Sequence, residues 1–173
     1  IITNEELKPE FQRLANWKTQ KGVPTIIRTI ESIDAEYSGG DLVDKIKNYL
    51  DDFASKWGDE GLYVLLGGDS EIVPTREVAS DKESLIELMA TDAFLVEKEL
   101  KINWGNKKVT NENSTRNIFI GRIPMKTIEE TNLFITNLLR YEKAPAGFQY
   151  QYLDNVLFAK AYMDKNVTEE YVY

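Results

Sequence analysis

Residues 61–69 read GLYVLLGGD, a short and nearly continuous run of apolar side chains that ends in two glycines and an aspartate. A run of this length and composition is typical of a strand buried on both faces in a parallel sheet. The two glycines mark the turn that ends the strand. We therefore predict a buried parallel strand over residues 61–66.

The segments that precede this strand alternate between helix and strand patterns. A capping box at residues 3–6 introduces an amphipathic helix predicted over residues 4–20, and the β-branched residues 24–30 predict a strand. A short connector over residues 31–37, which could be helical, leads to the clearest helix of the sequence, residues 42–57. Its N-cap is Asp41, and its apolar positions are Leu42, Ile46, Tyr49, Leu50, Phe53 and Trp57.

The segments that follow residue 115 repeat this alternation. Residues 117–121 (NIFIG) predict a second buried strand, closed by residues 122–124. A second capping box at residues 127–130 begins a helix that stops at the Pro/Gly break of residues 144–147, and residues 155–161 (NVLFAKA) predict a last strand. The inward positions predicted for this helix are Ile128, Thr131, Phe134, Ile135, Leu138 and Tyr141.

The region between these two halves shows no single dominant spacing of apolar residues. Residues 84–89 predict a helical turn and residues 93–96 a strand, whereas residues 100–109 resemble a hairpin around the polar turn 103–106. The region is therefore predicted as a β-rich insertion around residues 75–115.

This order of helices and strands predicts an α/β fold. Because crossovers between parallel strands are right-handed, we expect a mostly parallel sheet flanked by helices on both faces. The length of 173 residues corresponds to about one domain. The strand at 155–161 follows a Pro/Gly break and has no helix behind it, so residues 1–148 are predicted as one domain and residues 149–173 as the start of another. The tail after Ala161 is either disordered or part of a longer ordered segment.

The composition excludes several kinds of chemistry. The chain has no histidine and no cysteine, so it can form no Ser-His or Cys-His nucleophile pair, no Cys/His zinc site and no disulfide. A formal charge of −8 argues against nucleic acid and anionic membranes as partners, and no apolar run reaches the length of a transmembrane helix. No cofactor is predicted; a Ca²⁺ site remains open, but it would have to be assembled from separate loops.

Three polar side chains and one glycine form the candidate site. Gly68 and Asp69 follow the central strand, Arg122 ends the strand at 117–121, and Asp92 precedes residues 93–96. Because ligands bind beyond the carboxyl ends of strands in open α/β sheets, these residues could form a substrate-binding site. The structural alternative carries more weight: a turn capped by Asp69 and an Arg–carboxylate pair that fixes loop geometry. A carboxylate-based hydrolase using Asp69 and Asp92 is a third and weaker alternative.

Seven segments of the sequence resemble segments of a known family. They resemble the N-terminal half of the gingipain family of cysteine peptidases, in the caspase-like clan, and run in family order from Ile2 to about Ala161. YVLLGGDSEIVPTR and NIFIGRIP are the specific ones. The others are IITNEELKPEFQRLANWKTQKGVPT, SGGDLVDKIKNYLDDFASKWG, ATDAF, MKTIEETNLFITNLLRYEK and LDNVLFA.

The resemblance implies that residues 1–148 are an α/β subdomain that precedes a catalytic subdomain, of which residues 149–173 are the truncated start. In the family, the catalytic His in a Gly-His-Gly turn and the nucleophilic Cys come after the strand that residues 155–161 resemble, so no catalytic residue is carried over. The acidic residue that assists catalysis in some members has no counterpart in Ala161-Tyr162-Met163-Asp164.

The resemblance also implies a function for the parent protein. We expect a secreted, periplasmic or cell-surface peptidase of a Bacteroidetes-type bacterium, acting on proteins or peptides, with this chain inactive alone and its catalytic subdomain as partner. A stand-alone, non-catalytic surface or interaction module on the same α/β scaffold is the alternative. Substrate specificity and oligomeric state are not predicted.

Overall fold

The computed structural model describes residues 1–57, 61–82, 85–96, 101–103, 108–110 and 118–143. The chain divides into two units, Ile1–Glu142 and Lys143–Tyr173, and only Lys143 of the second unit lies among the described residues. The strand and the tail predicted after residue 154 therefore lie outside them. The described helices and strands belong to the first unit, apart from Lys143 at the end of α5 (Ile128–Lys143).

A parallel sheet of four strands forms the centre of the described fold. The strands are β1 (Ile2–Thr3), β2 (Arg28–Thr29), β3 (Leu62–Gly67) and β8 (Ile118–Ile123), in the order β2-β1-β3-β8. β3 and β8 pair over six positions in parallel register, from Leu62 opposite Ile118 to Gly67 opposite Ile123. The predicted α/β class with a mostly parallel sheet is confirmed.

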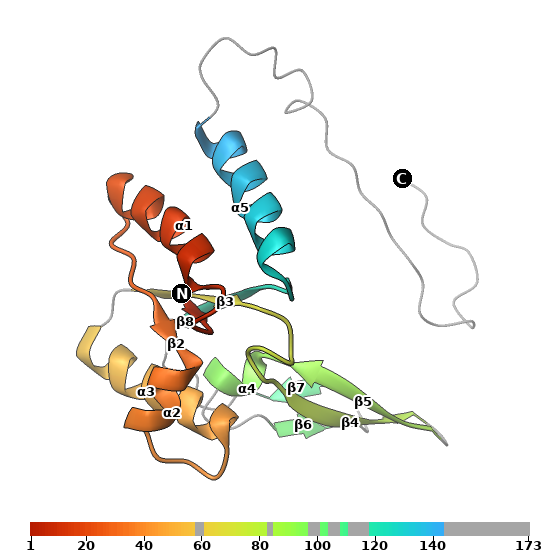
Figure 1. Ribbon diagram of the computed structural model, residues 1–173. Helices are drawn as coiled ribbons and strands as arrows, with labels where there is room; N and C mark the ends of the chain where they lie inside the picture. The colour runs from red at the N-terminus through yellow and green to blue at the C-terminus, as the bar shows by residue number, and fades with distance from the viewer. Residues whose placement is uncertain (58–60, 83–84, 97–100, 104–107, 111–117, 144–173) are drawn as a thin grey trace, which may run out of the picture. The chain divides into compact units, whose positions relative to one another are not determined.

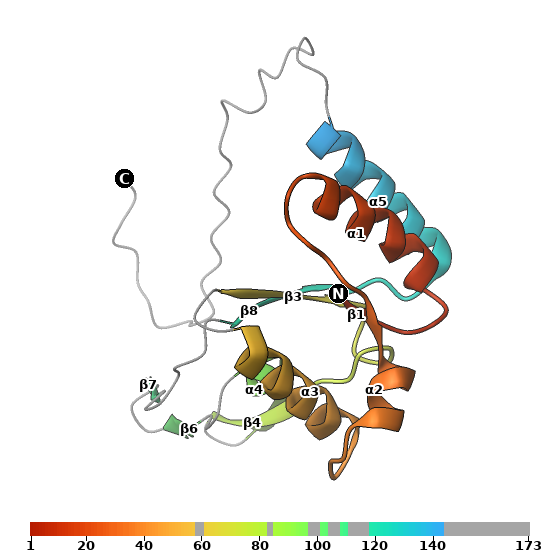
Figure 2. The same ribbon diagram turned by 90° about the vertical axis from the view of Figure 1, so that its left-hand side faces the viewer.

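Helices cover both faces of this sheet, as the crossover rule requires. α1 (Lys8–Gln20) and α5 (Ile128–Lys143) lie on one face, and α2 (Ile30–Glu36), α3 (Leu42–Trp57) and α4 (Ala93–Val96) lie on the other (Figure 1, Figure 2). Each face has its own apolar core. The core under α1 and α5 consists of Leu7, Phe11, Leu14, Ile123, Ile135 and Leu139. The core under α2, α3 and α4 consists of Ile2, Ile33, Val43, Ile46, Tyr49, Leu50, Val64, Leu66, Val73 and Leu95.

The β-rich insertion is confirmed, although two of its predicted elements are wrong. β4 (Arg76–Lys82) and β5 (Leu85–Thr91) pair antiparallel, as do β6 (Lys101–Asn103) and β7 (Lys108–Thr110). Residues 85–89 of the helical turn predicted at 84–89 lie in β5, because a full ladder with β4 determines their conformation. The strand predicted at 93–96 is α4, whose start is fixed by a hydrogen bond from the Ala93 amide to the Thr91 hydroxyl.

The two predicted helix starts have different outcomes. At α5 the capping box is confirmed: the Glu130 amide donates to Thr127 Oγ1 at 3.2 Å, and the Thr127 amide donates to the Glu130 carboxylate. At α1 it is wrong, because Thr3 is fully buried in β1 and its hydroxyl donates to the Gly67 carbonyl at 2.6 Å. Asn4 accepts the Leu7 amide instead, and α1 begins at Lys8.

The strand predicted at 24–30 is mostly wrong. Only Arg28–Thr29 pairs with β1, and Ile30 already begins α2. The Thr29 hydroxyl accepts the Ser32 amide at the start of that helix. An N-cap at Thr29 therefore ends the strand before Ile30, and residues 24–27 lie outside the ladder with β1 although Ile26 and Ile27 favour extension locally.

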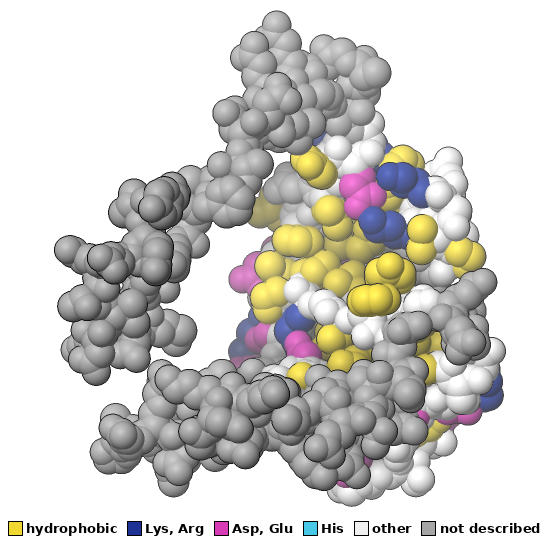
Figure 3. All heavy atoms as spheres, turned by 180° about the vertical axis from the view of Figure 1, so that it is seen from behind, with side chains coloured by type: hydrophobic (Ala, Val, Ile, Leu, Met, Phe, Trp, Pro, Cys, Tyr) yellow, Lys and Arg dark blue, Asp and Glu magenta, His cyan; other side chains and the backbone are white. Residues whose placement is uncertain are grey.

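Burial of the central strands is also less complete than predicted. Tyr63 in β3 is 74 % exposed and Phe119 in β8 is 55 % exposed, so neither strand is buried on both faces. On α5, Thr131, Ile135 and Leu139 are buried. Three residues predicted to point inward are instead exposed: Ile128 by 40 %, Phe134 by 37 % and Tyr141 by 59 %. Apolar side chains accordingly gather on one surface of the described fold (Figure 3).

Candidate functional site

Arg122 is the centre of the candidate site. It lies near the carboxyl end of β8, and its side chain is 14 % exposed. Its Nε and Nη2 donate to the two carboxylate oxygens of Asp92, at 2.9 and 2.7 Å. Its Nη1 donates to three carbonyl oxygens of the loop after β3, those of Gly68, Asp69 and Val73, at 2.7 to 2.9 Å. One guanidinium therefore joins β8, the β3 loop and the end of the β4–β5 hairpin.

The loop after β3 is a tight turn, which is held by hydrogen bonds from its own side chains and backbone. The Asp69 carboxylate accepts the amides of Glu71 and Ile72 at 2.9 and 3.1 Å. Gly68 has φ +145°, and a Cβ there would lie 2.5 Å from Ile72. The amides of Gly68 and Asp69 donate to the carbonyls of Ile123 and Met125, which fasten the turn to the end of β8. Glycine is thus required at position 68 by both backbone conformation and close approach.

The structure brings together all four residues that the sequence singled out: Gly68, Asp69, Asp92 and Arg122. Three of them, Asp69, Asp92 and Arg122, line a cavity of about 310 Å³ at the carboxyl ends of β3 and β8. The other lining residues are Ser70, Thr75, Thr91 and Pro124. Every nitrogen of the Arg122 guanidinium and both oxygens of Asp92 already take part in a hydrogen bond. Asp92 is therefore poorly suited to act as a general base, and the arrangement is that of a clamp on two loops.

A second arginine, which the sequence analysis did not single out, anchors the same hairpin. Arg76 begins β4, binds the carboxylates of Asp41 and Asp44 at the start of α3, and lies over the Phe94 ring at 5.0 Å. The hydrogen bond from Arg76 lowers the pKa of Asp41 below its ordinary value. The sequence signal was the arginine of the Val73-Pro74-Thr75-Arg76 segment, directly after the β3 loop. Because Arg76 lies opposite Thr91 in the ladder, the arginine–carboxylate contacts of Arg76 and of Asp92 hold the same end of the β4–β5 hairpin.

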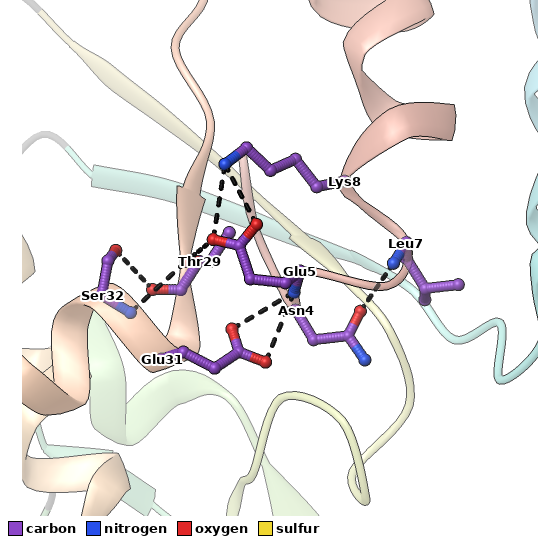
Figure 4. Close-up of polar contacts among 7 residues, drawn as sticks. All are labelled: Asn4, Glu5, Leu7, Lys8, Thr29, Glu31 and Ser32. Atoms are coloured by element: carbon purple, nitrogen blue, oxygen red, sulfur yellow. Dashed lines mark hydrogen bonds and ion pairs between the residues drawn. The ribbon is translucent and has the colours of Figure 1, made fainter.

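A further polar cluster lies at the carboxyl ends of β1 and β2 (Figure 4). The Glu31 carboxylate accepts the Glu5 amide, and the Glu5 carboxylate accepts the Thr29 hydroxyl at 2.8 Å and contacts Lys8. The hydrogen bond from Thr29, followed by that from Lys8, lowers the pKa of Glu5. A carboxylate held in its charged form is not a proton donor at neutral pH, so this cluster fixes the turn into α1.

Two further kinds of site were looked for among the described residues. Among them, no group of three or more His, Cys, Asp or Glu side chains could hold a metal ion. None of the helices in this part of the chain is both long and apolar enough to span a membrane.

The described fold and its carboxyl-edge loops define the chain as an open α/β domain with helices on both faces of a parallel sheet. The model of peptidase family C25, the gingipain family of cysteine peptidases, matches residues 1–172, and the chain belongs to this family. The comparison with curated proteins gave no match.

Among solved structures, the chain is similar to dimeric latent PorU from Porphyromonas gingivalis. The TM-score is 0.58 at 19 % identity, over 82 % of this chain and 15 % of that chain. At this identity the likeness shows the fold alone. The chain spans less than a sixth of the length of this neighbour. The family assignment makes the chain part of a peptidase region, and cysteine peptidases are hydrolases.

Proposed function

We propose that this chain is the non-catalytic N-terminal part of a gingipain-like cysteine peptidase. The observation that carries the proposal is a family match over residues 1–172 in a chain that contains neither histidine nor cysteine. A cysteine peptidase needs a thiolate to attack the scissile carbonyl and a histidine as its acid–base partner. Both groups then belong to a catalytic subdomain that follows, and this chain is inactive alone.

In this proposal, residues 1–148 are the supporting subdomain and residues 149–173 begin the catalytic one. The polar site fits a supporting role because its charged groups are already bound to the chain's own backbone and carboxylates. Arg122 and Arg76 hold the loops at the carboxyl edge of the sheet in one arrangement. Such loops can contribute a fixed wall to the rim of a neighbouring active site.

The position of α5 supports a boundary after this helix. α5 follows β8 and packs beside α1, as the hydrogen bond from Arg13 to Thr136 and the shared core demonstrate. The first of the two units of the chain ends at Glu142, in the last turn of α5, which agrees with a boundary after this helix.

The family also suggests where the parent protein acts. We propose that it is secreted, periplasmic or attached to the cell surface of a Bacteroidetes-type bacterium, and that its substrates are proteins or peptides. The acidic charge of −8 agrees with a partner that is neither nucleic acid nor an anionic membrane.

The test compares this chain with the parent protein on peptide substrates. The 173-residue chain should give no turnover, whereas the parent should cleave peptides and lose this activity on alkylation of its catalytic Cys or on a Cys→Ser substitution. A parent protein without a downstream Gly-His-Gly turn and Cys would refute the proposal. Peptide turnover by the 173-residue chain itself would do so as well.

A stand-alone interaction module on the same scaffold is the second candidate. It is favoured by the exposed aromatic pair Tyr63 and Phe119, since a solvated pair of this kind suits a protein partner. A reading frame that ends near this chain would select this candidate over the first.

A further inference from the structure

We draw no further inference here: the strongest candidate, the cavity of about 310 Å³ at the carboxyl ends of β3 and β8, belongs to the site already described, where the Arg122 guanidinium and the Asp92 carboxylate bind each other and Arg122 also binds the loop after β3, and nothing among the described residues that line it indicates which ligand it would take.

Discussion

Replacing Arg122 by alanine should destabilise this domain more than almost any other single substitution at its polar edge. The guanidinium is 14 % exposed and makes five hydrogen bonds, two to Asp92 and one each to the carbonyls of Gly68, Asp69 and Val73. Alanine removes all five and leaves the Asp92 carboxylate, which is 24 % exposed, without its counter-charge.

The expected cost follows from these contacts. Breaking a largely buried ion pair by removing one partner costs about 3–5 kcal/mol, because the remaining charge keeps its desolvation penalty. We place Arg122→Ala at the middle of this range, since Asp92 retains some access to water. A change of 1 kcal/mol shifts the Tm of a domain of 150–250 residues by roughly 2–4 °C, so the expected decrease is roughly 8–16 °C.

The assay is thermal and urea unfolding of the 173-residue chain, followed by circular dichroism. Arg122→Lys should recover only part of the loss, because an ammonium cannot pair with both Asp92 oxygens and also reach the loop carbonyls. Arg140→Ala, at an exposed position of α5, is the matched control and should change the Tm by little. A double-mutant cycle of Arg122→Ala with Asp92→Ala should give a coupling energy of about 1–3 kcal/mol.

A loss of less than about 1 kcal/mol for Arg122→Ala would refute this reasoning, because surface ion pairs are worth no more than that. Full recovery by Arg122→Lys would refute the specific role of the planar guanidinium. Either result would mean that the loop after β3 keeps its conformation without the clamp.

Three further predictions concern helix packing, a turn and a helix cap. The hydrogen bonds from Lys18 and then Trp17 lower the pKa of Glu142 in the folded protein below its ordinary value of 4.5. The stabilisation that the charged Glu142 gives the folded state is therefore complete above pH 4.5 and is lost as the pH falls through the lowered pKa. Trp17 fluorescence should follow this transition, and Glu142→Gln should remove it. Gly68→Ala should cost about 1–3 kcal/mol in urea unfolding, because φ is +145° and the new methyl meets Ile72, whereas Gly121→Ala should be nearly neutral. Thr127→Ala should cost about 0.5–2 kcal/mol through loss of the α5 cap, and Thr127→Ser should restore most of it; equal stability of these two variants would contradict the role of the hydroxyl.

Long periodic segments and strong local signals were readable from the sequence. α3 begins where Asp41 caps it, with the Asp44 amide donating to its carboxylate, and β3 ends at the predicted glycines. The capping box of α5 likewise appears as predicted. In these segments the conformation that the local sequence prefers is also the one that the global fold requires, so tertiary contacts do not change it.

Short apolar segments were not readable in this way. The segments 84–89 and 93–96 are each too short to separate a helical period from a strand period. The structure makes residues 85–89 strand and residues 93–96 helix, the opposite of the prediction. β2 ends at the Thr29 cap of α2, and its two-residue ladder with β1 leaves residues 24–27 outside the strand despite their preference for extension. The exposed flank of α5 was missed because apolar spacing identifies a helix face without showing whether anything covers it.

The features of the candidate site also separate into those set by local sequence signals and those set by tertiary contacts. The sequence by itself determined the parallel α/β fold, the loop after β3 and the positions of Asp69 and Arg122 at strand ends, because strand ends and glycine turns are local signals. It also determined, through the absence of histidine and cysteine, that this chain carries no thiol or imidazole chemistry. Only the tertiary structure decided that Arg122 binds Asp92 and three loop carbonyls, and that Tyr63 and Phe119 remain exposed. Those features depend on contacts between segments 30 to 60 residues apart, and such contacts are set by packing and register rather than by local preference.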